Sequence, residues 1–474
     1  MLDLNGLKFT LFPNNEISHR YFPVFGIASI DPGFLRELRC PHAMKKNAFP
    51  IYTQPCGWNA LLPSREALSP VIGNLDVQYV VVGAGFTGMA AARRLSELNP
   101  NASIVLLEAS TVGEGSSARN SGFLSRNEYP SSNSAEAIEQ NNILNGFNSE
   151  AFDGLQKIIE DHHIACDFHA SGRIRAAATP EGANTLRKIQ QALEATGHPT
   201  NTLDESALHK LIGTSYYKFG VHTDTGHLVQ PAALIRGMLS ALPQQIQVHE
   251  NSPVLDLKQH GKKWQLKTSS AQITADQVIM ATNASVKYFG YLQDKVVTIH
   301  TYAGITEPLK PSEIASFGSL ESWGVLPAHR LGTTVRRVGA DRLLVRSLYA
   351  YENSLSESVV HDALHRRFHN RYPELSHIRL EHVWGGVTAL TLNGSPYVGS
   401  LAPGLYASAG CNGSGIVKGT ALGSYLAELA HSNRTDPQIL KAYGTANKIL
   451  PDPFRALGFK VISAWESRKA GLES

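Results

Sequence analysis

The hydrophobic positions of this chain first follow a regular pattern near residue 79. An apolar run from Tyr79 to Val82 leads into a glycine-rich turn, then an alanine-rich stretch of helical spacing that ends near Asn99, then a second apolar run from Ile104 to Leu107. Short apolar runs on either side of a helix are typical of buried parallel strands. The pattern therefore predicts a strand–helix–strand unit.

The rest of the chain alternates between helical and extended patterns. Helical spacing predicts helices over 134–163, 180–196 and 231–242. Alternating polar and apolar positions predict strands over 254–257, 264–268, 277–281, 296–306, 333–349 and 378–390. Strands that recur after helices in this way favour a second, largely antiparallel sheet. The predicted fold class is α/β with an α+β second domain.

Residues 1–75 show no such pattern. Prolines recur throughout this stretch, from Pro13 to Pro70. Proline removes a backbone donor and interrupts helices and central strands. We expect an irregular leader that lies on the body of the protein.

Composition and charge restrict the class of function. The chain has 474 residues, of which 42% are hydrophobic and 18% charged, so a large buried core is expected. A formal net charge of +3, from 43 basic and 40 acidic side chains, gives no electrostatic footprint for nucleic acid. The N-terminus does not resemble a secretory signal, and no apolar run approaches the length that crosses a bilayer.

The spacing of the cysteines bears on the cellular compartment of the protein. Cys40, Cys56, Cys166 and Cys411 lie far apart without a CxxC pair. This spacing suggests neither a disulfide framework nor a structural zinc site. We therefore expect a soluble protein of the reducing cytoplasm.

The turn after the first strand carries a GxGxxG pattern. Gly83 permits a tight turn, Gly85 lets a pyrophosphate approach the backbone, and Gly88 lets the helix pack close to the strand. Glu108 ends the second strand, where a carboxylate accepts hydrogen bonds from ribose hydroxyls and disfavours a 2′-phosphate. Glycine turns also serve ordinary strand-to-helix packing, but the strand, helix, spacing and acid together favour a dinucleotide. They do not separate NAD from FAD.

Three later segments favour a flavin. Residues 113–124 form a small, polar, glycine-rich stretch with one arginine, which suits a loop wrapped around a flat cofactor. Residues 275–284 read as a strand that runs into a turn of small residues. Residues 409–418 open a helix that reaches about Ala430, and the amides at its start would stabilise negative charge on a reduced ring.

On these residues the chain resembles the D-amino-acid oxidase-like FAD oxidoreductases, especially the bacterial γ-glutamylputrescine oxidase and L-pipecolate oxidase branch. The resemblance covers roughly residues 76–450 and rests on four segments, at 117–122, 224–231, 384–399 and 412–413. It implies a Rossmann-like FAD-binding domain interleaved with a substrate domain on a mostly antiparallel sheet.

The resemblance also implies which residues hold FAD. They are Gly83, Gly85, Phe86, Thr87, Gly88, Glu108, Ala109, Ser117, Arg119, Asn120, Ser121, Gly122, Val254, Ala281, Thr282, Asn283, Gly410, Asn412, Gly413, Ser414, Gly415 and Ile416. Val254 would lie on a strand beside the adenine. No histidine replaces Arg119, and Cys411 lies in a glycine turn, so we expect noncovalent FAD.

The implied domain organisation is discontinuous. The leader is 1–75, and the FAD-binding domain takes 76–128, 223–290 and 383–432. The substrate domain takes 129–222 and 291–382, and 433–474 forms a helical C-terminal tail.

Four residues are candidates for substrate contact. Tyr302 would contact polar groups of the substrate and Trp384 would wall the flavin ring, although packing inside a sheet explains each aromatic equally well. Arg126 and Lys418 are the counterparts of the carboxylate-binding arginine and lysine of sarcosine-oxidase-like relatives, against the plainer alternative of surface charges. Arg346 is a third carboxylate candidate, with the same alternative.

Two further patterns favour ordinary structure over a site. His361, His365 and His369 share one helix face, but without HExxH a solvated basic face is the simpler interpretation, so no metal is expected. The C-terminal tail carries an apolar stripe flanked by basic residues, formed by Phe454, Leu457, Val461 and Trp465. Docking on the body or on another subunit is the simpler account of this stripe, and contact with a membrane surface is the alternative.

The implied activity is oxidation of a C–N bond in an amine or an N-substituted or cyclic amino acid. Hydride would pass to flavin N5, the imine would hydrolyse, and dioxygen would reoxidise the flavin to give hydrogen peroxide. Two alternatives remain open: a dehydrogenase that passes electrons to quinone or a protein, and a flavin-binding protein without turnover. An NAD dehydrogenase is a residual alternative. The sequence does not fix the substrate.

Overall fold

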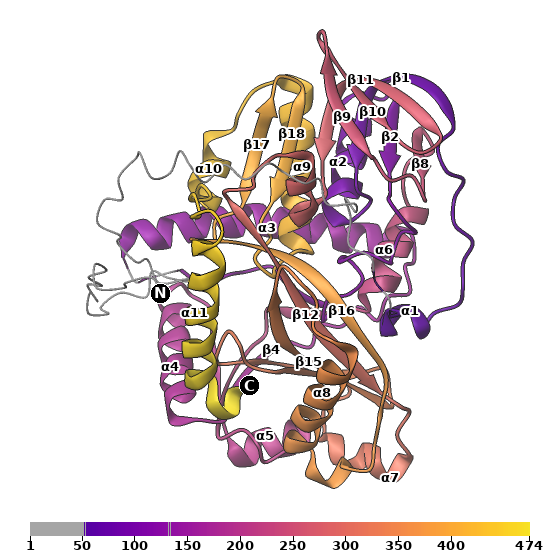
Figure 1. The fold of residues 1–474 in the computed structure, drawn as a ribbon. Helices are drawn as coiled ribbons and strands as arrows, with labels where there is room; N and C mark the ends of the chain where they lie inside the picture. Colours follow the sequence, from indigo (N-terminus) through magenta and orange to yellow (C-terminus); the bar gives the residue numbers. More distant parts are fainter. Residues whose placement is uncertain (1–51, 53, 131, 133) are drawn as a thin grey trace, which may run out of the picture.

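The computed structural model of the protein describes residues 52, 54–130, 132 and 134–474 (Figure 1). Most of the expected leader, including Cys40, lies outside these residues. Within the remainder, helix α1 (Gly57–Ala60) is followed by a stretch without regular structure that leads to strand β1 at Gly73.

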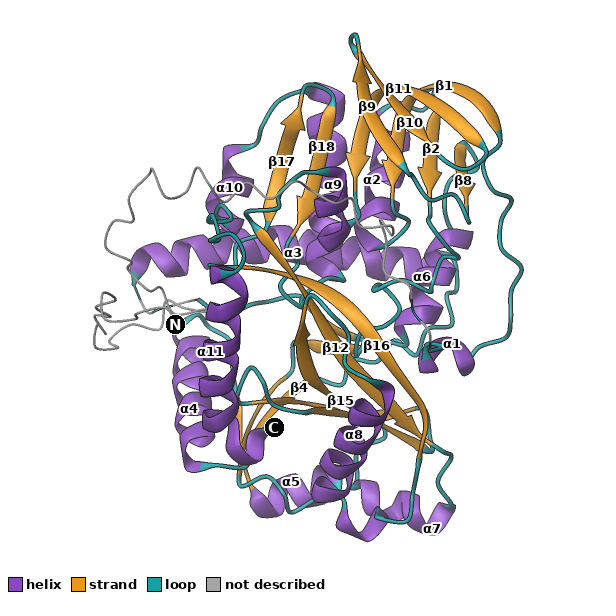
Figure 2. Ribbon diagram, in the orientation of Figure 1, coloured by secondary structure: helices purple, strands orange, loops and turns teal. Residues whose placement is uncertain are grey.

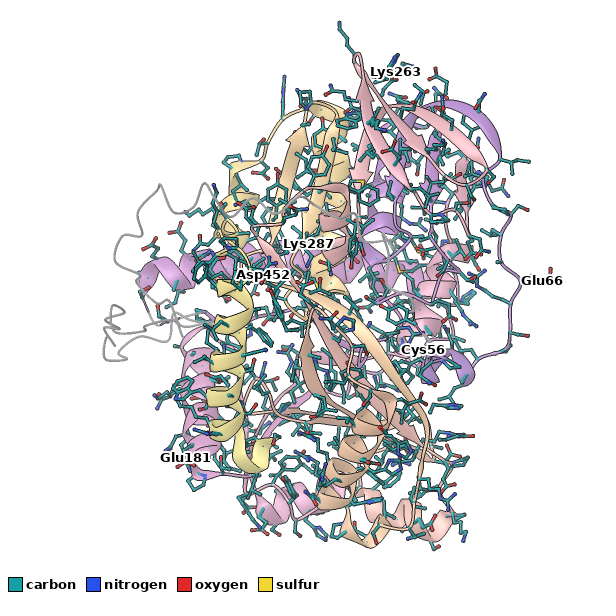
Figure 3. All side chains as sticks on the ribbon, in the orientation of Figure 1. Cys56, Glu66, Glu181, Lys263, Lys287 and Asp452 are labelled. Atoms are coloured by element: carbon teal, nitrogen blue, oxygen red, sulfur yellow. The ribbon has the colours of Figure 1, made fainter. Side chains whose placement is uncertain are left out.

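A mainly parallel sheet forms one half of the molecule (Figure 2). Its strands lie in the order β17-β18-β11-β1-β2-β8, and β10 and β9 extend it beside β11 as a hairpin. β1 pairs in parallel with β2 and β11, β2 with β8, and β11 with β18. The strands are β1 (Gly73–Val82), β2 (Ile104–Leu107), β8 (Ile246–His249), β9 (Asp256–His260), β10 (Lys263–Lys267), β11 (Ala271–Met280), β17 (Tyr397–Ala402) and β18 (Leu405–Ala409). Figure 3 shows Lys263 near the tip of the hairpin, far from the second sheet.

Helices cover this sheet closely. They are α2 (Phe86–Leu98), α3 (Ala135–Asp161), α6 (Pro231–Ser240), α9 (Val417–Ser432) and α10 (Pro437–Tyr443). α2 and α9 touch because Gly423 has no side chain, and a Cβ at that position would lie 2.2 Å from the Thr87 carbonyl oxygen. The two helices that start at the predicted cofactor turns therefore pack directly on each other.

A second sheet forms the other half, in the order β16-β12-β15-β14-β13-β4-β6-β5. All of its pairs are antiparallel except β13 with β4. The strands are β4 (Arg173–Ala177), β5 (Asn201–Asp204), β6 (Phe219–Thr223), β12 (Val296–Thr306), β13 (Gly324–Pro327), β14 (Thr334–Val338), β15 (Arg342–Tyr351) and β16 (Leu380–Thr391). A small ribbon of β3 (Phe123–Ser125) and β7 (Gly226–Leu228) lies outside both sheets.

Further helices belong to the half that contains the second sheet. They are α4 (Pro180–Ala195), α5 (Glu205–Ile212), α7 (Pro311–Ile314), α8 (Glu357–Arg371) and α11 (Phe454–Ala470), with short 3-10 turns at Ala315–Phe317, Pro373–Leu375 and Gly471–Glu473. Another 3-10 turn, Asn283–Phe289, follows β11 and packs in the core of the first sheet. α11 begins just after Asp452, which is labelled in Figure 3. Glu473, just beyond α11, accepts hydrogen bonds from the backbone amides of Ala178 and Thr179 at 2.9 and 3.0 Å. The C-terminus is therefore fixed to the start of α4.

The observed architecture confirms the predicted fold class, with two differences in detail. The expected domain boundary at residue 383 falls inside β16, which pairs with β12 along its whole length and so belongs to the second sheet. Val254 was predicted on a strand, but it precedes β9 in an irregular segment. Alternation along a strand reveals a buried face, but it does not reveal which sheet the strand joins or where pairing starts.

The C-terminal stripe does not dock on the described part of the body, and docking on another subunit stays a prediction. Phe454, Leu457, Val461 and Trp465 are 38%, 62%, 58% and 45% exposed. α11 instead turns another face inward, and the Phe459 ring stacks on Tyr351 with centroids 4.8 Å apart. No helix in the described part of the chain has the length and apolar character needed to cross a membrane.

Candidate active site

The predicted cofactor residues meet at one edge of the first sheet. Four neighbouring parallel strands, β2, β1, β11 and β18, end at this edge and are followed by Glu108, Gly83, Ala281 and Gly410. Parallel strands present their carboxyl ends on the same side, which is where α/β sheets bind ligands. Segments more than 300 residues apart in sequence therefore build one site, as the positions of Gly83 and Gly410 show.

The glycine turn has no room for side chains. Gly83 has a φ of +100°, which L side chains rarely adopt. A Cβ on Gly88 would lie 1.8 Å from the Gly83 carbonyl oxygen, and a Cβ on Gly85 would lie 2.7 Å from Ser117 Oγ. The backbone at the start of α2 is consequently open to a ligand, and its amides form an anion site.

Glu108 is fixed by backbone amides at the end of β2. Its carboxylate accepts hydrogen bonds from Ala84 N at 3.0 Å and Ser110 N at 3.1 Å. Burial raises the pKa of this carboxyl, and the two amides act in the opposite direction. An acceptor with spare lone pairs therefore stands beside the glycine turn, as ribose hydroxyls require.

Residues 117–122 form a loop, here called the flavin loop, that is held mostly by its own side chains. Ser117 Oγ accepts from Phe86 N at 3.2 Å, which ties the loop to α2. Arg119 donates to the carbonyl oxygens of Glu114 and Gly385 at 2.7 and 3.0 Å. The guanidinium of Arg119 is thus occupied by the protein, and we infer that it shapes the loop.

Arg336 also holds the flavin loop, and it escaped prediction from the sequence. This buried residue of β14 donates from Nη1 to Ser121 O at 2.7 Å and to Val229 O at 2.9 Å. Burial lowers its pKa to about 9. An arginine inside a sheet strand gives no sequence signal of its contacts, because the loop it holds is more than 100 residues away in the chain.

The late glycine turn, residues 410–416, is joined to β16 by side-chain contacts. Asn412 Oδ1 accepts from Thr391 N at 2.9 Å, and its Nδ2 donates to Gly410 O at 2.7 Å, so its side chain locks the turn. Cys411 Sγ lies 3.3 Å from both Asn283 Nδ2 and Thr388 Oγ1. The turn leads directly into α9, whose free amides favour negative charge nearby.

A cavity of about 780 Å³ joins these segments to the second sheet. Of the predicted cofactor residues, all line it except Gly88 and Gly410, which act on the backbone behind it. Lys418 and Arg346 also line it. The volume lies in the usual range for a small-molecule site.

Three predicted substrate residues lie outside this lining. Tyr302 is 3% exposed, and its hydroxyl accepts from Leu355 N at 2.6 Å within the second core. Trp384 packs edge-on against Trp58 at 6.4 Å and donates to Arg119 O at 3.4 Å, so it supports the flavin loop from behind. Both aromatics pack inside the protein, on the paired strands β12 and β16, whose residues alternate between the two faces of the sheet.

Arg126 is also directed elsewhere. It forms an ion pair with Asp153, and its guanidinium lies 4.6 Å from the centre of the Phe152 ring on α3. The lining residues of this segment are instead Ser125, Glu128 and Tyr129. Arg126 is therefore engaged by α3 and lies outside the cavity lining.

FAD fits the donors and acceptors of this cavity. The buried Thr282 Oγ1 has no hydrogen-bond partner among the described residues and lines the cavity. Polar buried groups need partners, so this hydroxyl suits a polar ligand. The glycine turn would supply contacts to the phosphates, Glu108 contacts to the adenosine ribose, and the α9 start contacts to a negatively charged ring.

The sequence did not single out the far wall of the cavity. Arg173 and Arg175 of β4 line it, and α11 contributes Phe459, Ile462, Ser463 and Glu466. Glu466 bonds His329 Nε2 at 3.1 Å and Arg330 Nη2 at 2.7 Å. Burial alone would raise the pKa of Glu466, but these bonds lower it to about 2. In the sequence, the signal that could have indicated this wall was the pair of arginines at alternate positions of a strand.

The histidine face of α8 lies elsewhere and is bonded to the protein backbone. His365 Nε2 accepts from Leu380 N at 2.9 Å, and a His369 ring nitrogen lies 3.1 Å from Ile378 O. Within the described ranges, no group of three His, Cys, Asp or Glu side chains is arranged to hold a metal ion.

Known proteins share this architecture. The sequence model of the FAD dependent oxidoreductase family (DAO) matches residues 78–429. The chain is 24% identical over 399 residues to the probable oxidoreductase OrdL of Rhizobium meliloti, covering 81% of this chain and 90% of that protein. It is 26% identical over 408 residues to the gamma-glutamylputrescine oxidoreductase of Escherichia coli, covering 81% of this chain and 92% of that protein.

A solved structure gives the same result for the fold. Glycine oxidase from Geobacillus kaustophilus superposes with a TM-score of 0.67 at 18% identity, covering 80% of this chain and all of that one. These matches confirm the resemblance seen in the sequence, including FAD as the cofactor of the family. The chain belongs to the DAO family of FAD-dependent oxidoreductases.

Proposed function

We propose that the protein oxidises a C–N bond of an amine or of an N-substituted or cyclic amino acid, with dioxygen as the electron acceptor. The observation that carries this proposal is the continuous cavity, which runs from the carboxyl edge of the parallel sheet to the face of the second sheet. A cofactor at the first end and a small molecule at the second would share one enclosed space. The names of relatives, gamma-glutamylputrescine oxidoreductase and glycine oxidase, support a nitrogen-bearing substrate.

FAD, when bound, supplies a hydride acceptor at its ring and a route for two electrons to dioxygen. The protein contributes position and environment. The flavin loop and the 410–416 turn, which both line the cavity, would hold the ring, and the α9 start would stabilise negative charge on it. The walls of the cavity exclude water, so an amine can lie with its lone pair free and its α-hydrogen facing the ring.

We further propose that FAD is held without a covalent bond. Cys411 is a cavity-lining cysteine, but its sulfur already contacts Asn283 and Thr388. Acid precipitation of the holoprotein should release all flavin into the supernatant. Flavin that stays with the precipitated protein would contradict this.

Anaerobic stopped-flow reduction tests the activity. Purified holoprotein is mixed with sarcosine, pipecolate, proline, polyamines and γ-glutamylputrescine in turn, and absorbance of the oxidised flavin is followed. The proposal predicts bleaching by at least one amine, followed by hydrogen peroxide when air is admitted. If none of these amines reduces a fully loaded protein, a flavin-binding protein without turnover becomes the better account.

A dehydrogenase is the second candidate, because of the exposed stripe on α11. Phe454, Leu457, Val461 and Trp465 are all exposed beside the cavity wall, where a quinone, a membrane surface or a partner protein would find an apolar contact. In that case an artificial acceptor would reoxidise the flavin quickly while air would do so slowly. We place the protein in the cytoplasm, and cell fractionation would check this.

A further inference from the structure

The far wall of the cavity carries an unusual pair of charges. Arg173 and Arg175 occupy alternate positions of β4, so both point to the same face of the sheet and line the cavity. Ile174 lies between the two arginines and Ala176 follows them on the strand. Their side chains point to the other face of the sheet, where they are 1% and 0% exposed within a hydrophobic core. The packing of this apolar face holds the strand in place, so the backbone positions of the two arginines are fixed.

The protein does little to neutralise this pair. Within the described chain, the Arg173 guanidinium makes no hydrogen bond and no ion pair, and Arg175 lies 5.3 Å over the Tyr129 ring. Burial lowers the pKa of Arg173 to about 10, the charge of Arg175 adds to this effect, and Glu128 opposes it. Two like charges inside a partly desolvated cavity are costly unless an anion joins them.

The surrounding lining keeps the excess positive. On this side of the cavity the arginines are Arg173, Arg175, Arg330 and Arg346, and the carboxylates are Glu128 and Glu466. Arg330 is paired with Glu466, and Arg346 donates to the Tyr349 hydroxyl, a neutral group. Among the described residues on this side of the cavity, four guanidiniums therefore stand against two carboxylates.

The order of strands sets how far this pair lies from the flavin loop. Gly386 and Thr388 of β16 line the cavity beside that loop, and Thr301 of β12 is next to them. β4 is four strands away from β12 in the sheet order. At the usual spacing of neighbouring strands this corresponds to about 19 Å between the two backbones. A ligand that reaches both places has several atoms between its two ends.

We infer that Arg173 and Arg175 form a carboxylate-binding subsite, and that the enzyme acts on elongated amines whose carboxylate lies at the end remote from the reacting C–N bond. The inference rests on the proposed function for the reacting end. The planar forks of two arginines match a carboxylate, and such charge-assisted bonds are the strongest that side chains form. A substrate as small as glycine reaches only one end of the cavity.

Paired substrates test the subsite. The holoprotein is reduced anaerobically with 6-(methylamino)hexanoate and with N-methylhexylamine, which has the same chain without the carboxylate. The subsite predicts that the carboxylate lowers the apparent dissociation constant about ten- to hundredfold. Arg173→Gln and Arg175→Gln should each remove most of this preference, which is measured within each variant as the ratio of the two apparent dissociation constants. Arg366→Gln, an exposed arginine on α8, serves as the matched control.

A second readout does not depend on turnover. Adipate has two carboxylates and no amine to oxidise, and its binding is followed by the shift of the flavin spectrum and of the unfolding temperature. Binding should weaken at least about tenfold in both glutamine variants. Arg173→Lys and Arg175→Lys keep the charge without the fork and replace the glutamine variants if these lose FAD.

The outcomes separate the two proposals. Reduction by some amine with no effect of the carboxylate, together with adipate binding that the variants leave unchanged, would overturn the subsite and keep the oxidation. Adipate binding that depends on both arginines, in a protein that no amine reduces, would keep the subsite and reject the oxidation.

Discussion

At the scale of single residues, the site depends on positions where a side chain is not tolerated. Gly88 belongs to α2, and a Cβ there would overlap the Gly83 carbonyl oxygen at 1.8 Å. Neither atom has freedom to move, because one belongs to the turn and the other to the helix that the turn starts. The third glycine of the pattern is therefore a packing requirement behind the cavity.

Gly88→Ala should weaken FAD binding by more than about tenfold, because the turn must move by a large part of an atomic diameter. Fluorescence titration of the apoprotein with FAD measures this. Gly146→Ala is the matched control, since Gly146 is also helical and a Cβ there meets nothing within 4 Å. It should bind FAD normally and gain about 0.5–1 kcal/mol of stability from helix propensity.

Arg336 shows the opposite case, a side chain whose removal leaves others without partners. Arg336→Met should cost about 1–3 kcal/mol for each carbonyl that loses its donor, Ser121 O and Val229 O, and should also weaken FAD binding. Urea unfolding and FAD titration measure the two effects. Arg337→Met on the same strand removes bonds to Leu320 and Ala340. Equal FAD affinity in both variants would show that Arg336 does not position the loop.

At the scale of elements, α11 is the least expected part of the site. Its apolar stripe predicted a docking face, but the residues that line the cavity lie on another face, with the ion pairs of Glu466 to His329 and Arg330. Hydrophobic spacing alone did not reveal the face of α11 that lines the cavity. An inward glutamate becomes intelligible only once its two partners are seen, and they are more than 130 residues earlier in the chain.

The contacts of Glu466 predict an acid limit for this element. The pKa of its carboxyl in the folded protein is lowered to about 2 from an ordinary value of 4.5. A lowered folded pKa stabilises the fold above the unfolded pKa, and this contribution is lost as pH falls from about 4.5 to about 2. Glu466→Gln should therefore unfold at a lower temperature than the parent at pH 7, with the difference shrinking towards pH 3. A constant difference across this range would contradict the assignment.

The elements themselves differ in how far the sequence revealed them. The strand–turn–helix around Gly83 was predictable because local spacing defines both its structure and its chemistry. The helices at 180–196 and 231–242 were equally clear, since the structure places α4 at Pro180–Ala195 and α6 at Pro231–Ser240. Tyr302 and Trp384 were not assignable, because alternation in β12 and β16 does not tell which face meets the cavity. The pair Arg173 and Arg175 becomes visible only when β4 is placed in its sheet.

At the scale of the whole molecule, FAD should act as a structural bridge. It would contact the ends of β1, β2, β11 and β18 as well as the flavin loop, and bind the folded chain alone. Each tenfold rise of free FAD above its dissociation constant should then add about 1.4 kcal/mol to the free energy of unfolding. Scanning calorimetry at several FAD concentrations checks this, with FMN as the control because it lacks the adenosine part. An unfolding temperature independent of FAD would contradict the assigned site.

The order of strands in the first sheet also bears on how the protein is made. β1 lies at the centre, between a strand that follows it closely and β11, and β18 arrives only at residues 405–409. During translation the ribosome must therefore release the chain through residue 409 before the pocket can close. Such distant pairing slows folding and leaves sheet edges unpaired meanwhile. Cofactor loading is then a late event of biogenesis, and a cell short of riboflavin would accumulate chains that depend on chaperones.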